Sequence, residues 1–96
     1  MRKIYWSLYG HNRCTMQVEY TPHFKRRFAK FSPTIQRKFR KQLGFLFNDI
    51  NHPSLRAKKF DEAEGVWQAR VDNNVRFYFR ITRELYSLLD IRRHKD

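Results

Sequence analysis

The stretch from Gly65 to Ile81 reads GVWQARVDNNVRFYFRI and carries the clearest structural signal in the chain. On both sides of Asp72-Asn73-Asn74, apolar and polar residues alternate, which is typical of two β-strands joined by a tight turn. The alternation predicts a core-facing set formed by Trp67, Ala69, Val71, Val75, Phe77, Phe79 and Ile81. The open face then carries Gln68, Arg70, Arg76, Tyr78 and Arg80.

A third strand follows this hairpin. The segment from Leu85 to Arg92 is rich in apolar residues and comes after the turn Thr82-Arg83-Glu84, so we expect a three-stranded antiparallel meander. Both alternating sets of this segment are apolar as far as Asp90, so the period does not identify its inward side. The cationic run from Arg92 to Lys95, which includes His94, is expected beside the arginines of the open face.

Two amphipathic helices are predicted before the meander. The first places Phe24, Phe28 and Phe31 at positions i, i+4 and i+7. The second opens with Ser32 as N-cap and Pro33 at the first helical position. Its apolar stripe consists of Ile35, Phe39, Leu43, Leu46 and Ile50. The short link between them predicts an antiparallel helical hairpin.

The remaining segments complete an α+β fold. Residues from Met16 to Tyr20 alternate like a short N-terminal strand, and Asn51 to Gly65 reads as a loop. We therefore expect one domain over residues 16–96, formed by a strand, a helical hairpin and a three-stranded meander. Residues 1–15 show no clear period and are predicted to be an N-terminal extension that need not belong to the core.

The charge distribution favours a polyanionic partner. Lys and Arg number 21 against nine Asp and Glu, and the whole net charge of +12 lies in residues 1–60. Such a charge attracts nucleic acid, because each neutralised phosphate releases counterions. The 17% aromatic content argues against a disordered basic tail.

Other classes of function receive no support from the sequence. The single Cys14 allows no internal disulfide, and the histidines and cysteine lack zinc-ligand spacing. No apolar stretch is long enough to span a membrane. We expect a cytoplasmic protein with no membrane association, no metal and no small-molecule cofactor.

The order of these elements resembles the RelE/ParE superfamily of bacterial toxins. The similarity covers residues 16–96 and includes HPSLRAKK at 52–59, GVWQARV at 65–71, VRFYFR at 75–80 and LLDIRRH at 88–94. The resemblance implies a type II toxin–antitoxin toxin that a cognate antitoxin neutralises. Members of the RelE type cleave mRNA at the ribosome, so mRNA and the ribosome are expected partners.

The resemblance also assigns candidate site residues. Metal-independent RNA cleavage needs cations around the phosphate and a proton donor for the 5'-oxygen. By position in the family pattern, the catalytic candidates are Arg70, Arg76, Arg93 and His94. Imidazole titrates near neutral pH, which suits His94 for the acid role. The RNA-binding candidates are Lys58, Lys59, Gln68, Tyr78, Arg80 and Arg92.

Two departures from the family pattern leave alternatives open. Gln68 occupies the place of a lysine in some members, and no tyrosine follows His94 where several relatives carry a base-stacking one. No proton acceptor is evident, although Glu62 and Glu64 are candidates by position. The alternatives are a ParE-like inhibitor of DNA gyrase and a catalytically degenerate relative that only binds antitoxin.

Overall fold

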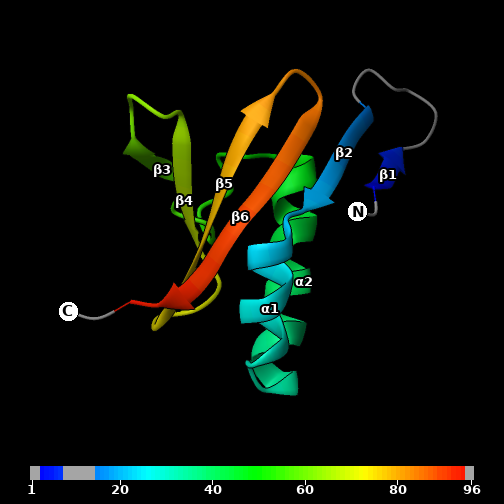
Figure 1. Cartoon of the computed structure of the whole chain (residues 1–96). Helices are drawn as coiled ribbons and strands as arrows, with labels where there is room; N and C mark the ends of the chain where they lie inside the picture. Colours follow the sequence, from blue (N-terminus) through cyan, green and yellow to red (C-terminus); the bar gives the residue numbers. More distant parts are fainter. Residues whose placement is uncertain (1–2, 8–14, 95–96) are drawn as a thin grey trace.

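The computed structural model describes residues 3–7 and 15–94, with side chains from residue 16 onward. Two helices accompany a six-stranded sheet in this part of the chain (Figure 1). In chain order the elements are β1 (Lys3–Ser7), β2 (Thr15–Tyr20), α1 (Pro22–Ala29), α2 (Pro33–Asn48), β3 (Lys58–Asp61), β4 (Val66–Arg70), β5 (Val75–Thr82) and β6 (Leu85–Arg93). The α+β class and the meander β4-β5-β6 confirm the sequence prediction.

The strand order is β1-β2-β6-β5-β4-β3. The strands β2 and β6 run parallel, whereas every other neighbouring pair is antiparallel. The sheet therefore places the end of β6 beside the β4–β5 turn, at the end of the sheet away from the β5–β6 turn (Figure 1).

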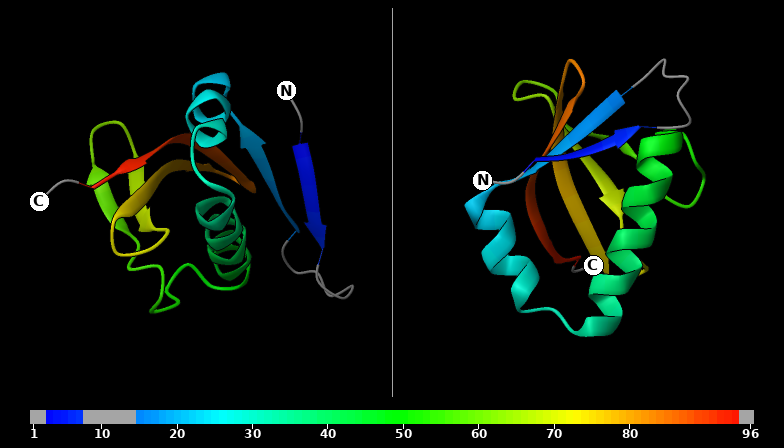
Figure 2. Two further views of the ribbon diagram at one scale, coloured as in Figure 1. Left: turned by 90° about the horizontal axis from the view of Figure 1, so that it is seen from below. Right: turned by 90° about the vertical axis from the view of Figure 1, so that its right-hand side faces the viewer.

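Both helices begin at caps that the sequence encodes. The Ser32 hydroxyl accepts a hydrogen bond from the Ile35 N–H at 3.3 Å, and Pro33 opens α2. Thr21 caps α1 in the same way through the Phe24 N–H at 3.2 Å, so α1 begins two residues before its first buried aromatic residue. The helices run in opposite directions from the short link between them (Figure 2), which confirms the predicted hairpin.

Aromatic rings packed in tilted and edge-to-face pairs form the core between the helices and the sheet. The ring of Phe39 lies 5.4 Å from that of Phe24 and 5.2 Å from those of Phe28 and Phe77, measured between centroids. Phe24, Phe39 and Phe77 are at most 2% exposed. Burial of these rings gives the small domain its main source of stability.

The meander departs from strict alternation at one point. A β-bulge between Tyr78 and Phe79 inserts an extra residue in β6, because Tyr78 pairs with Asp90 and Phe79 pairs with Leu88. The buried residues of β6 are Tyr86, Leu88 and Ile91, so their spacing changes from two to three at the bulge. This shift explains why the inward side of β6 could not be assigned from sequence.

Some expectations for the core were wrong. Ile81 was expected to be buried but is 36% exposed near the end of β5. The predicted loop 51–65 contains β3, an edge strand that pairs with β4. Its sequence, KKFD, is highly charged, and lysines are common on edge strands because they oppose edge-to-edge aggregation. The charged residues hid the strand signal.

The N-terminal segment contributes β1, although no strand period is visible in its sequence. β1 pairs with β2 in an antiparallel ladder that runs from the pair Lys3–Glu19 to the pair Ser7–Thr15. The side chains of residues 1–15 lie outside the described part of the chain, so the boundary at residue 16 stays a prediction. Lys95, from the predicted cationic run, also lies outside the described residues. Neither helix within the described residues has the length and apolarity needed to cross a membrane.

Candidate nucleic-acid interface

Two rows of side chains cross the face of the sheet opposite the helices. Cross-strand pairing aligns Lys58 with Gln68 and Gln68 with Tyr78, which forms the first row. The second row aligns Arg70 with Arg76 and Arg76 with Arg92. Three arginines in direct cross-strand register repel one another, and an anion on this face would relieve that repulsion.

A hollow of about 270 Å³ opens where the two rows meet the end of β6. Its lining contains five cationic or imidazole side chains and one amide: Arg56, Lys58, Gln68, Arg70, Arg76 and His94. Among the described residues, no carboxylate lines it. We call this set of six residues the cationic hollow. Five of its members were predicted from sequence, and Arg56 was not.

Arg76 is the most buried cation of the hollow, with 8% of its surface exposed. One guanidinium nitrogen donates to the carbonyl oxygens of Asp72 at 2.8 Å and Asn73 at 3.2 Å. The β4–β5 turn thus holds the side chain in a fixed orientation. A fixed, partly desolvated guanidinium suits bidentate binding of a phosphate.

Arg70 lies beside Arg76 under strong electrostatic influence. Desolvation, followed by the positive charges of Arg56 and Arg76, lowers the pKa of Arg70 from its ordinary value, while Asp72 acts in the opposite direction. The guanidinium still carries its charge at neutral pH because an arginine titrates so far above it. The positive charges of Arg56, Arg70 and Arg76 therefore repel one another, and this repulsion favours a bound anion.

Arg56 owes its place to a loop anchored by buried contacts. Leu55 is fully buried, and its carbonyl accepts a hydrogen bond from the Arg70 N–H at 2.8 Å. Arg56 itself has a φ of 47°, in the left-handed region that non-glycine residues rarely adopt. Its position next to Arg70 depends on this loop conformation, and the sequence offers no periodic signal for it.

Gln42 ties the same loop to α2 and β4. This side chain is 5% exposed, and its Nε2 donates to the carbonyl oxygens of Ser54 at 3.1 Å and Arg70 at 2.9 Å. Its Oε1 accepts a hydrogen bond from the Ser54 hydroxyl at 3.0 Å. A buried glutamine with all these bonds fixes the separation between Arg56 and Arg70. The only sequence signal was a polar residue between apolar positions of the helix.

Asp72 organises the β4–β5 turn from which Arg76 is held. Its Oδ1 accepts hydrogen bonds from the N–H groups of Asn74 and Val75, both at 2.9 Å. Desolvation acts to raise the pKa of Asp72, but these backbone bonds and the ammonium of Lys38 outweigh it and lower the pKa overall. The carboxylate is a structural acceptor and a poor candidate for a general base.

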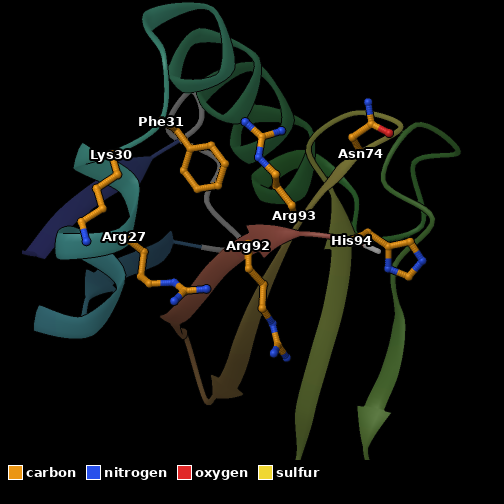
Figure 3. Close-up of a pocket in the computed structure, with 7 residues that line it drawn as sticks. All are labelled: Arg27, Lys30, Phe31, Asn74, Arg92, Arg93 and His94. Carbon is orange, nitrogen blue, oxygen red and sulfur yellow. The ribbon is translucent and has the colours of Figure 1, made fainter. Parts of the chain in front are cut away.

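Arg92 and Arg93 point to opposite sides of β6. Arg92 lies on the open face, where its guanidinium is 4.5 Å from the centre of the Tyr78 ring. Arg93 points toward the helices, with its guanidinium 5.6 Å from the centre of the Phe31 ring (Figure 3). The structure therefore does not bring Arg93 into the cationic hollow with Arg70 and Arg76.

Tyr78 is covered, and a neighbouring aromatic ring is exposed in its place. Tyr78 is 6% exposed, beneath Arg92 and the edge of Phe60, whose ring centre is 4.9 Å away. Phe60, from the unpredicted β3, is 51% exposed. An exposed ring beside arginines can stack on a base. Sequence reasoning missed Phe60 because it lies in the segment expected to be a loop.

Four further candidates lie away from the hollow. Lys59 lies over the Trp67 ring at 5.3 Å, and Arg80 forms an ion pair with Glu64 at 3.5 Å. Glu62 is 4.0 Å from the Lys59 ammonium. The structure thus engages Glu62 and Glu64 in surface ion pairs near the β3–β4 turn and not in the lining of the hollow.

His94 lies at the end of β6, where its N–H donates to the Asn74 carbonyl at 2.6 Å. This bond anchors the backbone that carries the imidazole beside Arg76. The resulting arrangement can bind a phosphate through arginines and move a proton through an imidazole. Within residues 16–94, no group of three or more His, Cys, Asp or Glu side chains could hold a metal ion.

No protein-family model matches the sequence, and no curated protein does either. Solved structures of bacterial toxins do match the fold. The YoeB dimer of Staphylococcus aureus superposes with a TM-score of 0.70 at 11% identity, over 81% of this chain and 95% of that chain. YafQ from Escherichia coli gives 0.66 at 13% identity, over 82% and 93% of the two chains.

A third match is the toxin–antitoxin complex RelBE2 from Mycobacterium tuberculosis. Its matching chain gives a TM-score of 0.65 at 21% identity, over 80% of this chain and 95% of that chain. These similarities each cover about four fifths of this chain, and the helical hairpin and strand layout agree with the resemblance drawn from the sequence. The chain therefore has the fold of the RelE/ParE superfamily of toxins.

Proposed function

We propose that this chain is the toxin of a type II toxin–antitoxin pair and that it cleaves RNA at the cationic hollow. The observation that carries the proposal is the convergence of Arg56, Arg70, Arg76 and His94 on one hollow of the open sheet face. Solved structures of similar fold include complexes with antitoxins, which supports an antitoxin as partner. The messenger RNA and the ribosome are the proposed targets.

The proposed reaction is an internal transesterification. The 2'-oxygen of a ribose attacks the adjacent phosphorus, the bond from phosphorus to the 5'-oxygen breaks, and a 2',3'-cyclic phosphate forms. Arg70 and Arg76 bind the non-bridging oxygens, whose negative charge increases in the transition state. His94 donates a proton to the departing 5'-oxygen. The proton of the 2'-hydroxyl passes to solvent, since no described carboxylate lines the hollow.

The assignment of roles follows from burial and orientation. Arg76 is held by turn carbonyls before any ligand arrives, so its binding to the phosphate loses little side-chain entropy. Arg56 and Lys58 add charge at the rim and contribute mainly to affinity. Gln68 is buried in the lining and offers an amide that can bond to a ribose or base.

The test is to map RNA ends after induced expression in growing cells. New 5' ends within translated messages are expected for the wild-type chain. Arg76→Lys keeps the charge but loses the planar fork, and His94→Gln removes the proton donor; each should lower cleavage about 100-fold or more. Arg83→Asn is the matched control, because Arg83 lies in the β5–β6 turn with a φ of 55° that asparagine tolerates.

Other outcomes separate the remaining possibilities. If growth stops while messages stay intact and DNA breaks appear, RNA cleavage is contradicted and gyrase is indicated as the target. The absence of any growth defect, with antitoxin binding retained, would indicate a degenerate relative.

A further inference from the structure

We propose that a second cationic groove, between the end of α1 and the end of β6, binds the RNA nucleotides that flank the one in the hollow. The proposal rests on the proposed function and extends it by naming a second RNA subsite. The groove has a volume of about 820 Å³ and is lined by Arg27, Lys30, Phe31, Asn74, Arg92, Arg93 and His94 (Figure 3). We call it the flanking groove.

Within the described residues, the charge of the flanking groove is only half balanced, because Asp90 pairs with Arg27 and Arg92 but not with the other two cations. Four of its lining residues are cations, and no carboxylate is among the described residues that line it. Asp90 already lies within 3.1 Å of His23 and 3.2 Å of Arg27, and it also pairs with Arg92 at 3.6 Å. Among the described residues, no ion pair involves Lys30 or Arg93. These two cations are available to phosphates.

Arg93 is oriented before a ligand binds. Its guanidinium stacks over Phe31, and its backbone is held by pairing with Val75 and by the following bond from His94 to Asn74. Guanidinium and ring together offer a positive charge next to an apolar plane. A nucleotide presents the complementary pair, a phosphate next to a planar base.

The flanking groove and the cationic hollow share one wall. His94 lines both, and Arg92 borders the groove from the open face, whereas Arg93 lies on the helix side of β6. A strand of RNA with one phosphate at Arg76 therefore reaches the flanking groove by passing His94. An acidic peptide would match the charge of the groove, but it would not need this continuity with the hollow.

The length of the bound RNA is the basis of the experiment. The full-length protein is titrated with 2'-O-methyl oligonucleotides, which cannot be cleaved, of three and nine nucleotides at several salt concentrations. The double variant Lys30→Gln/Arg93→Gln should bind the trimer like the wild type. For the nonamer, the loss of two phosphate contacts should reduce the salt slope by about 1.4. Between 50 and 200 mM salt, wild-type affinity should then fall about 7-fold more than that of the variant.

Matched variants separate failure of the groove from failure of the hollow. Arg83→Asn removes a charge at the other end of the sheet and should leave the affinity for both oligonucleotides unchanged. If the double variant keeps the wild-type slope while Arg76→Lys weakens both oligonucleotides, the groove proposal is overturned and the proposed function stands. Loss of affinity for a polyglutamate peptide without loss for the nonamer overturns it in favour of an acidic protein partner. Absence of any RNA binding by the wild type overturns both proposals.

Discussion

Replacing Gln42 with leucine removes three hydrogen bonds while keeping a side chain of similar volume in α2. Leucine cannot donate to the carbonyl oxygens of Ser54 and Arg70, which lose the bonds of 3.1 and 2.9 Å. An acceptor left unpaired in a buried place costs roughly 1–3 kcal/mol. After allowance for the apolar burial that leucine gains, we expect the free energy of unfolding to fall by roughly 2–4 kcal/mol.

Urea unfolding followed by circular dichroism measures this loss. In a domain of this size, the expected fall in the free energy of unfolding corresponds to a melting temperature lower by roughly 10–25 °C. Lys41→Leu is the matched control, because Lys41 is exposed on the same helix and should change stability by no more than about 0.5 kcal/mol. If Gln42→Leu is as stable as this control, Gln42 does not anchor the loop that carries Arg56.

A double-mutant cycle tests the same network more directly. The Ser54 hydroxyl donates to Gln42 Oε1 at 3.0 Å, so Ser54→Ala and Gln42→Leu share one bond. Their effects on the free energy of unfolding should be less than additive by roughly 0.5 kcal/mol or more. Strict additivity would show that the hydroxyl and the amide act independently.

Three further predictions concern residues around the same site. The pKa of Asp72 is lowered in the folded state, so its contribution to stability is present above its unfolded pKa and is lost as the pH falls through the folded value. The free energy of unfolding should therefore fall less for Asp72→Asn than for the wild type between pH 7 and pH 3. Arg56→Gly relieves the φ of 47° but removes a cation, so we expect RNA affinity to fall while the free energy of unfolding changes by less than about 1 kcal/mol; a large loss of stability would contradict the strain argument. Phe39→Ala removes the central ring of the core and should cost about 3–5 kcal/mol in thermal unfolding, whereas a cost below 1 kcal/mol would mean that the core collapses around the space.

Local periodicity was enough to predict most of the fold from sequence. The alternation from Val66 to Ile81 placed β4 and β5, and the capping signal at Ser32 placed the start of α2. These signals are reliable because the alternation of side chains along a strand and the capping of helix-end N–H groups depend on residues that are close in sequence. The same alternation predicted that Arg70 and Arg76 share the open face.

Edge effects and irregular backbone escaped the sequence. The edge strand β3 has one open side, so lysines are tolerated there and the apolar alternation disappears. The bulge opposite Tyr78 changes the phase of β6. Since each added residue moves the next side chain to the other face, Arg92 and not Arg93 joins the arginines of the open face.

The sequence by itself determined the class of elements, their order and the cationic character of the second half's open face, because each depends on residue type at short spacing. Only the tertiary structure decided which cations meet. Arg56 reaches Arg70 through a loop held by the buried Gln42 and Leu55, and His94 reaches Arg76 because β6 pairs with β5 up to the β4–β5 turn. Such contacts join residues far apart in the chain, and no local pattern records the packing that brings them together.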